Sequence, residues 1–377
     1  MPLHPLLMKI AIVTESFLPT INGVTNSVLR ILEFFDSYGH EAIVIAPEAN
    51  SGSDDHLGFK VKRVPSISLK RLIPIAIPKR TLRHFIEGFN PDVIHLASPA
   101  ILGTYVNHVS RELDIPTLSV YQTDVAGFAK HYGIGIGNTS IQKTFARIHN
   151  QTSRTLAPSS AAASDLLKHG TQNVHIWPRG VDLHRFSPAH RSESLRLSWG
   201  AQHRTVIGYV GRLAREKSLE KLSVLDSNPN LQLVLIGDGP DRKRIERRLP
   251  NAIFTGMMGG AELAKGIASF DIFVHTGMNE TFCQSAQEAL ASGVPVIAPA
   301  SGGPLDLVTD GENGFFFEGQ NPRSLEDAIE LALSSNLEDL EFRARESVLG
   351  RDWASINKQL IDHYRAILAK PLEAHAA

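Results

Sequence analysis

Two glutamates separated by seven residues are the most distinctive chemical pattern in this sequence. Glu280 and Glu288 lie in the run 279–288, which follows an apolar run typical of a buried strand. A helix that begins between them points its first amides toward the space beside Glu280, where they can bind a phosphate or a sugar oxygen. Glu288, further along that helix, can reach a ribose. Either glutamate alone could lie on a solvated surface, but the whole run favours a binding site.

Two cations follow another predicted strand, at residues 205–210. Arg212 and Lys217 lie in the run 211–217, and a pair of cations there suits a diphosphate that gains charge as its sugar leaves. The alternative is two solvated charges that open a helix. The chain contains no Asp-x-Asp motif, so we expect no bridging metal ion and no cofactor. The two cations and helix amides would neutralise the phosphates instead.

Glycines follow the ends of several predicted strands. Gly23, next to Asn22, lies between the first strand and its helix, where it lets the loop approach a phosphate. A structural N-cap at Asn22 is the alternative, and both roles are compatible. Gly237 follows strand 231–236 and is a weaker signal, because glycine is also common in ordinary tight turns.

A polar run, Tyr-Gln-Thr-Asp at 121–124, follows strand 117–120 and faces the expected cleft. Gln122 cannot act as a general base at neutral pH, so Asp124 is the candidate for accepting a proton. Cys283, at the predicted helix start, is either a reactive thiol or a small buried residue, and we expect the second. The spacing of the histidines resembles no zinc site.

The elements that position these residues alternate between short β-branched runs and longer helical patterns, which is typical of parallel sheets covered by helices. The first half has predicted strands at 9–13, 42–46, 92–96, 117–120 and 174–177, and helices at 24–38, 100–113, 139–151 and 159–169. The second half has predicted strands at 205–210, 231–236, 252–254, 272–275 and 296–298, and helices after Glu216 and at 242–249, 261–269 and 282–291.

This order predicts an α/β protein with two facing Rossmann-like, doubly wound parallel-sheet domains. We place the first domain at 1–182 and the second at 200–352, with a linker between about Asp182 and Gly200. The last helix, 354–368, is expected to pack back on the first domain. Open sheets of this kind bind ligands at the carboxyl ends of their strands, so a cleft between the domains would hold a donor against one and an acceptor against the other.

The sequence resembles retaining glycosyltransferase family 4 along nearly its whole length, in segments 15–19, 22–28, 95–99, 121–124, 179–182, 211–213 and 280–288. The resemblance implies the two-domain GT-B fold, with 1–182 as the acceptor-side domain and 200–352 as the nucleotide-sugar-binding domain. It is greatest to actinobacterial GDP-mannose-dependent α-mannosyltransferases that act on glucuronosyl diacylglycerol and phosphatidylinositol-type lipid anchors. It therefore implies a retaining hexosyltransferase of lipomannan-like glycolipid synthesis, with GDP-mannose and a lipid-linked acceptor as partners.

The resemblance also implies residue roles. The catalytic residues would be Asp124, Glu280, Arg212 and Lys217, and the acceptor-side residues Gln122, Thr123 and Asp124. The donor would be bound by Asn22, Gly23, Gly211, Arg212, Lys217, Gly237, Met258, Glu280, Thr281, Phe282, Cys283 and Glu288, with backbone groups of 254–258 at the base.

Two positions depart from the family pattern. Asn22 stands where relatives carry glycine, and Gln122 stands where many carry histidine. Proton abstraction by residue 122 is thus in doubt, and Asp124 or the leaving phosphate would take the proton. We favour the front-face mechanism, in which the phosphate does so; a covalent route through a carboxylate nucleophile is the alternative.

Eight basic residues and no acidic one lie between residues 60 and 86, around the apolar run 72–78. Two prolines prevent that run from forming a helix core. Basic residues contribute about 1 kcal/mol each near an anionic leaflet, so we expect an anionic membrane surface as partner. A solvated loop with a buried apolar staple is the alternative. The basic residues are Lys60, Lys62, Arg63, Lys70, Arg71, Lys79, Arg80 and Arg83.

The bulk composition narrows the classes further. Lys plus Arg (38) nearly equal Asp plus Glu (39), so we expect no nucleic-acid partner. The single cysteine excludes an internal disulfide and fits a reducing compartment. No apolar run approaches the roughly 20 residues that span a bilayer, and the opening residues lack signal-peptide features. We expect a cytoplasmic protein, peripheral on the inner face of the plasma membrane.

Four other functions remain open at this stage. A glycosyltransferase with a UDP-sugar donor and a sugar-nucleotide epimerase share the expected fold, and a non-catalytic sugar-nucleotide sensor would bind in the same cleft. A dinucleotide-dependent oxidoreductase would also use Rossmann-like sheets. Against the last, no G-x-G-x-x-G motif follows the first strand.

Overall fold

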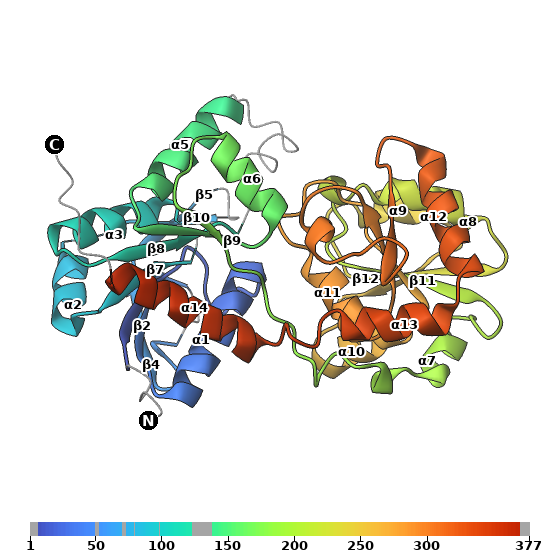
Figure 1. Ribbon diagram of the computed structural model, residues 1–377, viewed down its shortest axis with the longest axis horizontal. Helices are drawn as coiled ribbons and strands as arrows, with labels where there is room; N and C mark the ends of the chain where they lie inside the picture. The colour runs from blue at the N-terminus through green and yellow to red at the C-terminus, as the bar shows by residue number, and fades with distance from the viewer. Residues whose placement is uncertain are drawn as a thin grey trace.

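Each half of the chain folds around its own parallel β-sheet (Figure 1). The computed structural model describes residues 7–49, 53–69, 73–78, 80–97, 99–122 and 138–369. The predicted fold class, two Rossmann-like α/β domains, is confirmed.

The N-terminal sheet has eight strands in the order β10-β9-β8-β7-β1-β2-β4-β3, all parallel except the β3–β4 pair. Its central strands are apolar on both faces because helices cover both sides. The strands are β1 (Lys9–Val13), β2 (Glu41–Pro47), β3 (Asp55–His56), β4 (Phe59–Val64), β7 (Val93–Leu96), β8 (Thr117–Val120), β9 (Arg154–Ala157) and β10 (Val174–Ile176). The helices are α1 (Gly23–Tyr38), α2 (Thr81–Phe89), α3 (Ile101–Glu112), α5 (Asn138–Asn150) and α6 (Ser160–Lys168).

The basic stretch 60–86 contains structure that the sequence analysis did not predict. Its first residues form β4, which pairs with β2, and the apolar run forms part of a two-stranded antiparallel hairpin of β5 (Ser66–Leu69) and β6 (Ile73–Ala76). Helix α2 follows. The described residues of this stretch therefore form a strand, a hairpin and a helix and not a loop, while binding to a membrane surface stays a prediction.

The C-terminal sheet has six strands in the order β13-β12-β11-β14-β15-β16. They are β11 (Thr205–Val210), β12 (Leu231–Ile236), β13 (Ile253–Gly256), β14 (Ile272–Val274), β15 (Val296–Pro299) and β16 (Gly314–Phe317). The helices are α7 (Glu193–Ser198), α8 (Ser223–Asp226), α9 (Arg242–Arg248), α10 (Gly260–Ala268), α11 (Gln284–Ala291), α12 (Pro322–Ser334) and α13 (Leu337–Glu346).

The helix predicted after Glu216 is replaced by two 3₁₀ turns, η2 (Arg215–Lys217) and η3 (Leu219–Leu222), and the short α8. Ser218 between the turns has a φ of 51°, a left-handed conformation that interrupts a continuous α-helix. Because this segment turns tightly, it returns Lys217 toward the carboxyl edge of the sheet.

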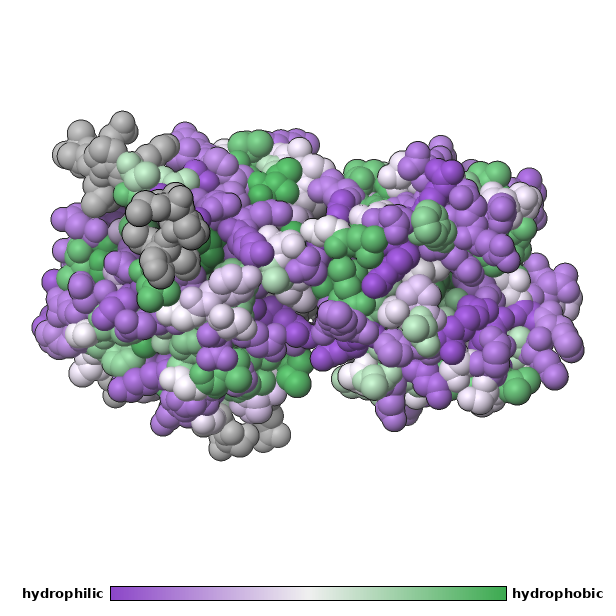
Figure 2. Space-filling model, turned by 60° about the horizontal axis from the view of Figure 1, so that its bottom comes forward, coloured by the Kyte–Doolittle hydropathy of each residue, from purple (hydrophilic) through white to green (hydrophobic). Residues whose placement is uncertain are grey.

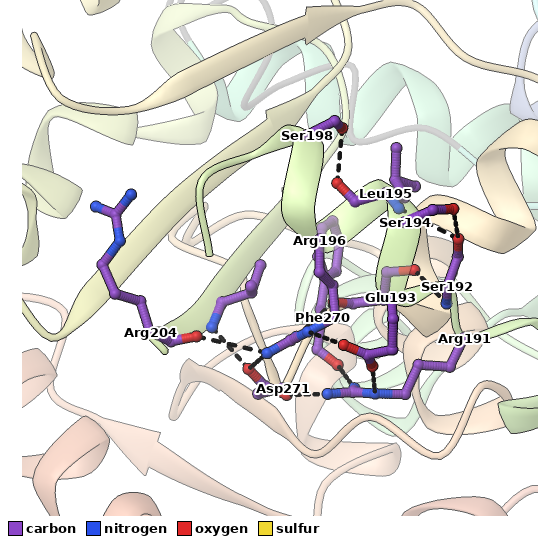
Figure 3. A network of polar contacts seen from close by, with 12 residues as sticks. Arg191, Ser192, Glu193, Ser194, Leu195, Arg196, Ser198, Arg204, Phe270 and Asp271 are labelled. Carbon is purple, nitrogen blue, oxygen red and sulfur yellow. Dashed lines mark hydrogen bonds and ion pairs between the residues drawn. The ribbon is translucent and has the colours of Figure 1, made fainter. Parts of the chain in front are cut away.

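The stretch between Asp182 and Gly200, predicted as a linker, packs on the C-terminal domain instead. Its side chains Phe186 and Trp199 join the core of that domain, and it contains the turn η1 (Pro188–His190) and α7. Figure 3 shows the polar network that joins this stretch to Asp271, which accepts a hydrogen bond from Arg191 Nη2 at 2.6 Å and whose Oδ2 lies 3.0 Å from Arg196 Nη2. Val206 N also donates a hydrogen bond to Asp271, at 2.7 Å.

Helix α14 (Trp353–Leu368) crosses from the C-terminal domain and lies along α1 on the N-terminal domain (Figure 1). Its Ile356, Leu360 and Tyr364 belong to the N-terminal core. The Tyr364 hydroxyl is 2.7 Å from His95 Nδ1. The helix thus belongs structurally to the domain from which it is most distant in sequence.

We expect Asp271→Ala to lower the free energy of unfolding of the C-terminal domain by about 3 kcal/mol, because it leaves the buried guanidinium group of Arg196 and the partly exposed one of Arg191 without their carboxylate. The measurement is denaturant unfolding followed by the fluorescence of Trp199, which packs on Phe270. Glu193→Ala is the matched control: its side chain is 75% exposed, so we expect a loss below about 0.5 kcal/mol. Equal effects of the two substitutions would contradict the structural role of Asp271.

Candidate functional site

Glu280 lies in the loop between β14 and α11, at the carboxyl edge of the C-terminal sheet, and is paired with two basic groups. Lys217 Nζ donates a hydrogen bond to Glu280 Oε1, and His275 Nε2 lies 3.2 Å from the same oxygen. All three side chains are largely removed from solvent. The structure therefore brings together the predicted residues Lys217 and Glu280, and adds His275, which the sequence analysis placed only at the end of a predicted strand.

The pKa shifts in this cluster follow from burial and charge. Burial alone would raise the pKa of Glu280, but close contact with His275 and the charges of His275 and Lys217 hold it well below its usual range. Burial opposes charge on Lys217 too, yet Glu280 raises its pKa above the ordinary value. Burial would lower the pKa of His275, but contact with Cys283 and Glu280 raises it to about 10. At neutral pH the carboxylate thus stays ionised among cations.

The loop that carries Glu280 is held by the glycines of the segment 302–303. Gly303 N donates to Glu280 O at 2.7 Å. A Cβ on Gly302, which has a φ of 67°, would lie 2.6 Å from the same carbonyl oxygen, so only glycine fits there. The helix begins at Gln284, after the buried Cys283 with its left-handed φ of 80°. It starts two residues later than predicted and leaves Thr281 and Phe282 in the loop.

Glu288 lies within α11 and is partly buried. Burial raises its pKa to about 7, against the opposing effects of a hydrogen bond with Gln284 and of the nearby charges of Arg185, Arg179 and Arg30. A carboxyl group with this pKa changes its charge near neutral pH, which is common among residues of functional sites.

Arg212 is exposed, and no hydrogen bond or ion pair joins its side chain to the described parts of the chain. The neighbouring glycines, Gly211 and Gly237, are needed because the backbone packs closely there. A Cβ on Gly237 would lie 2.0 Å from Gly211 O, so these two strand ends touch through their backbones.

Met258 packs into the core, while Met257 beside it is 83% exposed. If the 254–258 segment binds a base, the side chain on its surface is therefore that of Met257.

The N-terminal half-site centres on the start of α1. Asn22 is the N-cap: its side chain accepts a hydrogen bond from Thr25 N at 2.9 Å. Gly23 begins the helix, and Arg179, a residue to which the sequence analysis gave no role, donates to its carbonyl oxygen. Gln122 follows β8 and binds Arg179 as well. Thr123 and Asp124 lie outside the described residues, so their predicted roles stay predictions.

The two half-sites meet across the domain boundary. Thr281 Oγ1 donates to Gln122 O at 3.3 Å, and Ser159 Oγ donates to Thr281 O at 2.8 Å. Asp306 accepts hydrogen bonds from the backbone N (2.6 Å) and the hydroxyl of Ser160, at the amino end of α6. The loop that carries Glu280 is thereby joined to the segment that carries Gln122.

The basic residues of the stretch 60–86 have different environments. Arg63 donates to three backbone carbonyl groups, and Arg83 pairs with Glu87 and Glu112. The ammonium groups of Lys60 and Lys62 both lie 5.4 Å from the ring centre of Phe85, and Arg80 is exposed. Lys70, Arg71 and Lys79 lie outside the described residues.

The comparisons with known proteins agree with this geometry. Residues 21–185 match the model described as Glycosyltransferase Family 4, and residues 193–347 match that described as Glycosyl transferases group 1. The chain is 45% identical over 369 residues to a GDP-mannose-dependent alpha-mannosyltransferase of Mycolicibacterium smegmatis, covering 96% of this chain and 98% of that protein. It is 30% identical to a sulfoquinovosyl transferase of Arabidopsis thaliana, covering 92% and 71%.

The chain belongs to glycosyltransferase family 4. Among solved structures, Anabaena HepE in complex with UDP superposes with a TM-score of 0.77 at 19% identity, covering 95% of this chain and all of the other. The sucrose-phosphate synthase of Thermosynechococcus elongatus gives 0.76 at 21%, covering 96% and 99%. These likenesses confirm the predicted GT-B fold, and the enzyme is a glycosyltransferase.

The described residues of this glycosyltransferase contain neither a candidate metal site nor a helix that could span a membrane. Within the described ranges, no three His, Cys, Asp or Glu side chains come together as a group that could hold a metal ion. Among the helices described, none is both long and apolar enough to cross a membrane.

We expect Asp306→Ala to open the cleft of the free glycosyltransferase, because it removes both hydrogen bonds that join the loop at 303–306 to α6. Small-angle scattering should show a larger radius of gyration, and kcat/KM should fall about tenfold, the loss expected for bonds to one charged group. Asp310→Ala is the control, since Asp310 accepts only the backbone N of Phe316 within its own domain. An unchanged radius in Asp306→Ala would show that this contact does not hold the domains together.

Proposed function

We propose that this glycosyltransferase is a retaining, GDP-mannose-dependent α-mannosyltransferase whose acceptor is a glycolipid of the glucuronosyl diacylglycerol or phosphatidylinositol mannoside type. The observation that carries the donor assignment is similarity: three actinobacterial proteins with the name GDP-mannose-dependent alpha-mannosyltransferase are 44% or 45% identical over 96% of this chain. The geometry around Glu280 supports transfer from a nucleoside diphosphate sugar.

In the proposed reaction, Lys217 and Arg212 bind the donor diphosphate and stabilise the charge that develops as the sugar bond breaks. Lys217 is already fixed by Glu280, whereas Arg212 is exposed and can turn toward a phosphate. Glu280, kept ionised by its neighbours, accepts hydrogen bonds from sugar hydroxyl groups, and Glu288 accepts them from the ribose. These cations replace a bridging metal ion, so we propose that no metal or cofactor is required.

The acceptor hydroxyl would enter on the face from which the diphosphate leaves, and the leaving phosphate would take its proton. Gln122 supports this front-face route, because an amide is not basic enough to take the proton. Its Nε2 and Oε1 are also both hydrogen bonded within the protein. Asp124 is the protein residue that could take the proton in its place.

A lipid-linked acceptor would place the enzyme at an anionic membrane surface, on the cytoplasmic side. Lys60 and Arg80 supply exposed charge for this contact, beside the β5–β6 hairpin. Arg63 is held by backbone carbonyl groups and Arg83 is paired with Glu87 and Glu112, so these two side chains are engaged within the protein. On the face shown in Figure 2, hydrophobic side chains lie in separate groups among hydrophilic ones.

The decisive experiment is a donor test with purified enzyme. We expect new glycolipid from GDP-mannose with extracted actinobacterial lipids, unchanged by EDTA, and none from UDP-glucose or UDP-glucuronate. Transfer from a UDP-sugar would refute the mannosyl assignment. Inhibition by EDTA would refute metal independence, and interconversion of the free sugar nucleotide without transfer would identify an epimerase.

We expect the affinity for GDP-mannose, measured by calorimetry without acceptor, to weaken as pH falls through about 7. The folded-state pKa of Glu288 is raised to about 7, so its carboxylate form, which accepts the ribose hydroxyl groups, predominates above that pH and is lost below it. If only that form binds, Kd rises about tenfold from pH 8 to pH 6. Glu288→Gln should bind more weakly at pH 8 and lack this dependence; a Gln variant with the wild-type pH profile would exclude Glu288 as its source.

A further inference from the structure

Arg179 lies where the chain leaves the N-terminal domain, three residues after β10, and its side chain turns back into the cleft. Its Nη2 donates a hydrogen bond to Gly23 O, at the start of α1, and another to Gln122 Oε1 at 2.7 Å. The guanidinium group therefore joins the two segments of the N-terminal half-site that are 99 residues apart in sequence. Both partners are residues for which the sequence predicted substrate contacts.

The amide of Gln122 is fixed at both ends. Its Nε2 donates to Ala97 O, just past the end of β7, at 2.9 Å, and its Oε1 accepts from Arg179. The backbone oxygen of Gln122 accepts the hydroxyl of Thr281 from the other domain. The orientation of the Gln122 amide therefore depends on Arg179.

Gly23 is fitted closely to the same guanidinium group. A Cβ at this position would lie 3.1 Å from Arg179 Nη1 and 3.6 Å from Nη2. The absence of a side chain lets the arginine lie directly against the first turn of α1. The amino end of a helix and a guanidinium group both attract anions, so the arginine also adds positive charge beside this turn.

The backbone of Arg179 is held by the opposite domain. Its carbonyl oxygen accepts a hydrogen bond from Gln287 Nε2 at 3.0 Å, and that of Gly180 accepts one from Gln284 Nε2 at 3.1 Å. Both glutamines belong to α11, the helix of Glu288. Burial lowers the pKa of Arg179 to about 10, with Glu288 acting in the opposite direction, so the group is still charged at neutral pH.

We propose that Arg179 is a positioning residue that couples α11 to the N-terminal half-site, through Gln122 on the acceptor side and through Gly23 at the start of α1. This inference rests on the proposed transfer reaction and adds to it a residue that sets the geometry between the enzyme's two substrates. Both hydrogen bonds are donated by Nη2, at the tip of the arginine side chain. A lysine keeps the charge, but its shorter side chain and tetrahedral ammonium group do not place a donor at the position of Nη2.

The test begins with Arg179→Lys, assayed with GDP-mannose and lipid acceptor. We expect kcat for transfer to fall about 10- to 100-fold, the scale of loss that a misplaced reacting group causes. The Kd for GDP-mannose should change less than about threefold, because donor contacts on the C-terminal domain are retained. Hydrolysis of the donor, relative to transfer, should increase.

Arg345→Lys is the matched control, because Arg345 also donates to several backbone oxygens, among them those of Leu183 and Phe186, but lies away from the cleft. Thermal unfolding of both variants is measured beside activity. A purely structural role of Arg179 would give the two variants similar ratios of lost activity to lost stability, and would overturn the proposal.

A double-mutant cycle with Gln122→Ala decides whether Arg179 acts through Gln122. We expect Arg179→Lys to cost less than about threefold more in kcat once Gln122 is removed, since the two residues act as one unit. Additive losses, or a Kd for GDP-mannose weakened tenfold or more by Arg179→Lys, would overturn the inference while the proposed function stands. A wild-type enzyme inactive with every donor would overturn both.

Discussion

The ionised carboxylate of Glu280 needs compensating charge inside the protein, and this constraint organises the C-terminal half-site. Removing an unpaired carboxylate from water costs several kcal/mol, so cations must come from elsewhere in the chain. Lys217 lies in the turn after β11, and His275 follows the end of β14. Both reach the same oxygen because parallel strands end at a common edge of the sheet. The cation proposed for the diphosphate is thus held in place before any donor binds.

The second constraint is that the chain passes between the two domains twice. The chain passes from the N-terminal domain near residue 181 and returns near residue 352, and the two passages lie side by side: Val181 N donates to Arg351 O at 2.9 Å. A Cβ on Gly180 would lie 2.6 Å from Trp353 Cα. Because α14 is anchored in the N-terminal core, any relative motion of the domains acts on this narrow junction. Arg179 lies directly beside it.

The local sequence pattern was sufficient to predict the ends of strands that are buried on both faces. The strands at 9–13, 117–120, 205–210 and 231–236 have the predicted ends, since apolar runs covered on both faces are bounded by polar turns. Prediction failed for β4, although Phe59 and Val61 point inward and Lys60 outward with the period of two that marks a strand. We interpreted the basic residues of this segment as a membrane-binding surface and did not predict a strand. The tight turns after Lys217 depend on a left-handed serine, which no periodicity reveals.

The sequence by itself determined the fold class, the family and the run around Glu280, because hydrophobic periodicity and a distinctive spacing of chemical groups are local properties. Only the tertiary structure decided which groups meet. Lys217 and Glu280 are 63 residues apart, and Arg179 is 156 residues from Gly23. Contacts over such separations depend on how two sheets and a returning helix pack against each other. That packing fixed the Gln122 amide between Ala97 and Arg179, and gave Arg179 contacts with both domains.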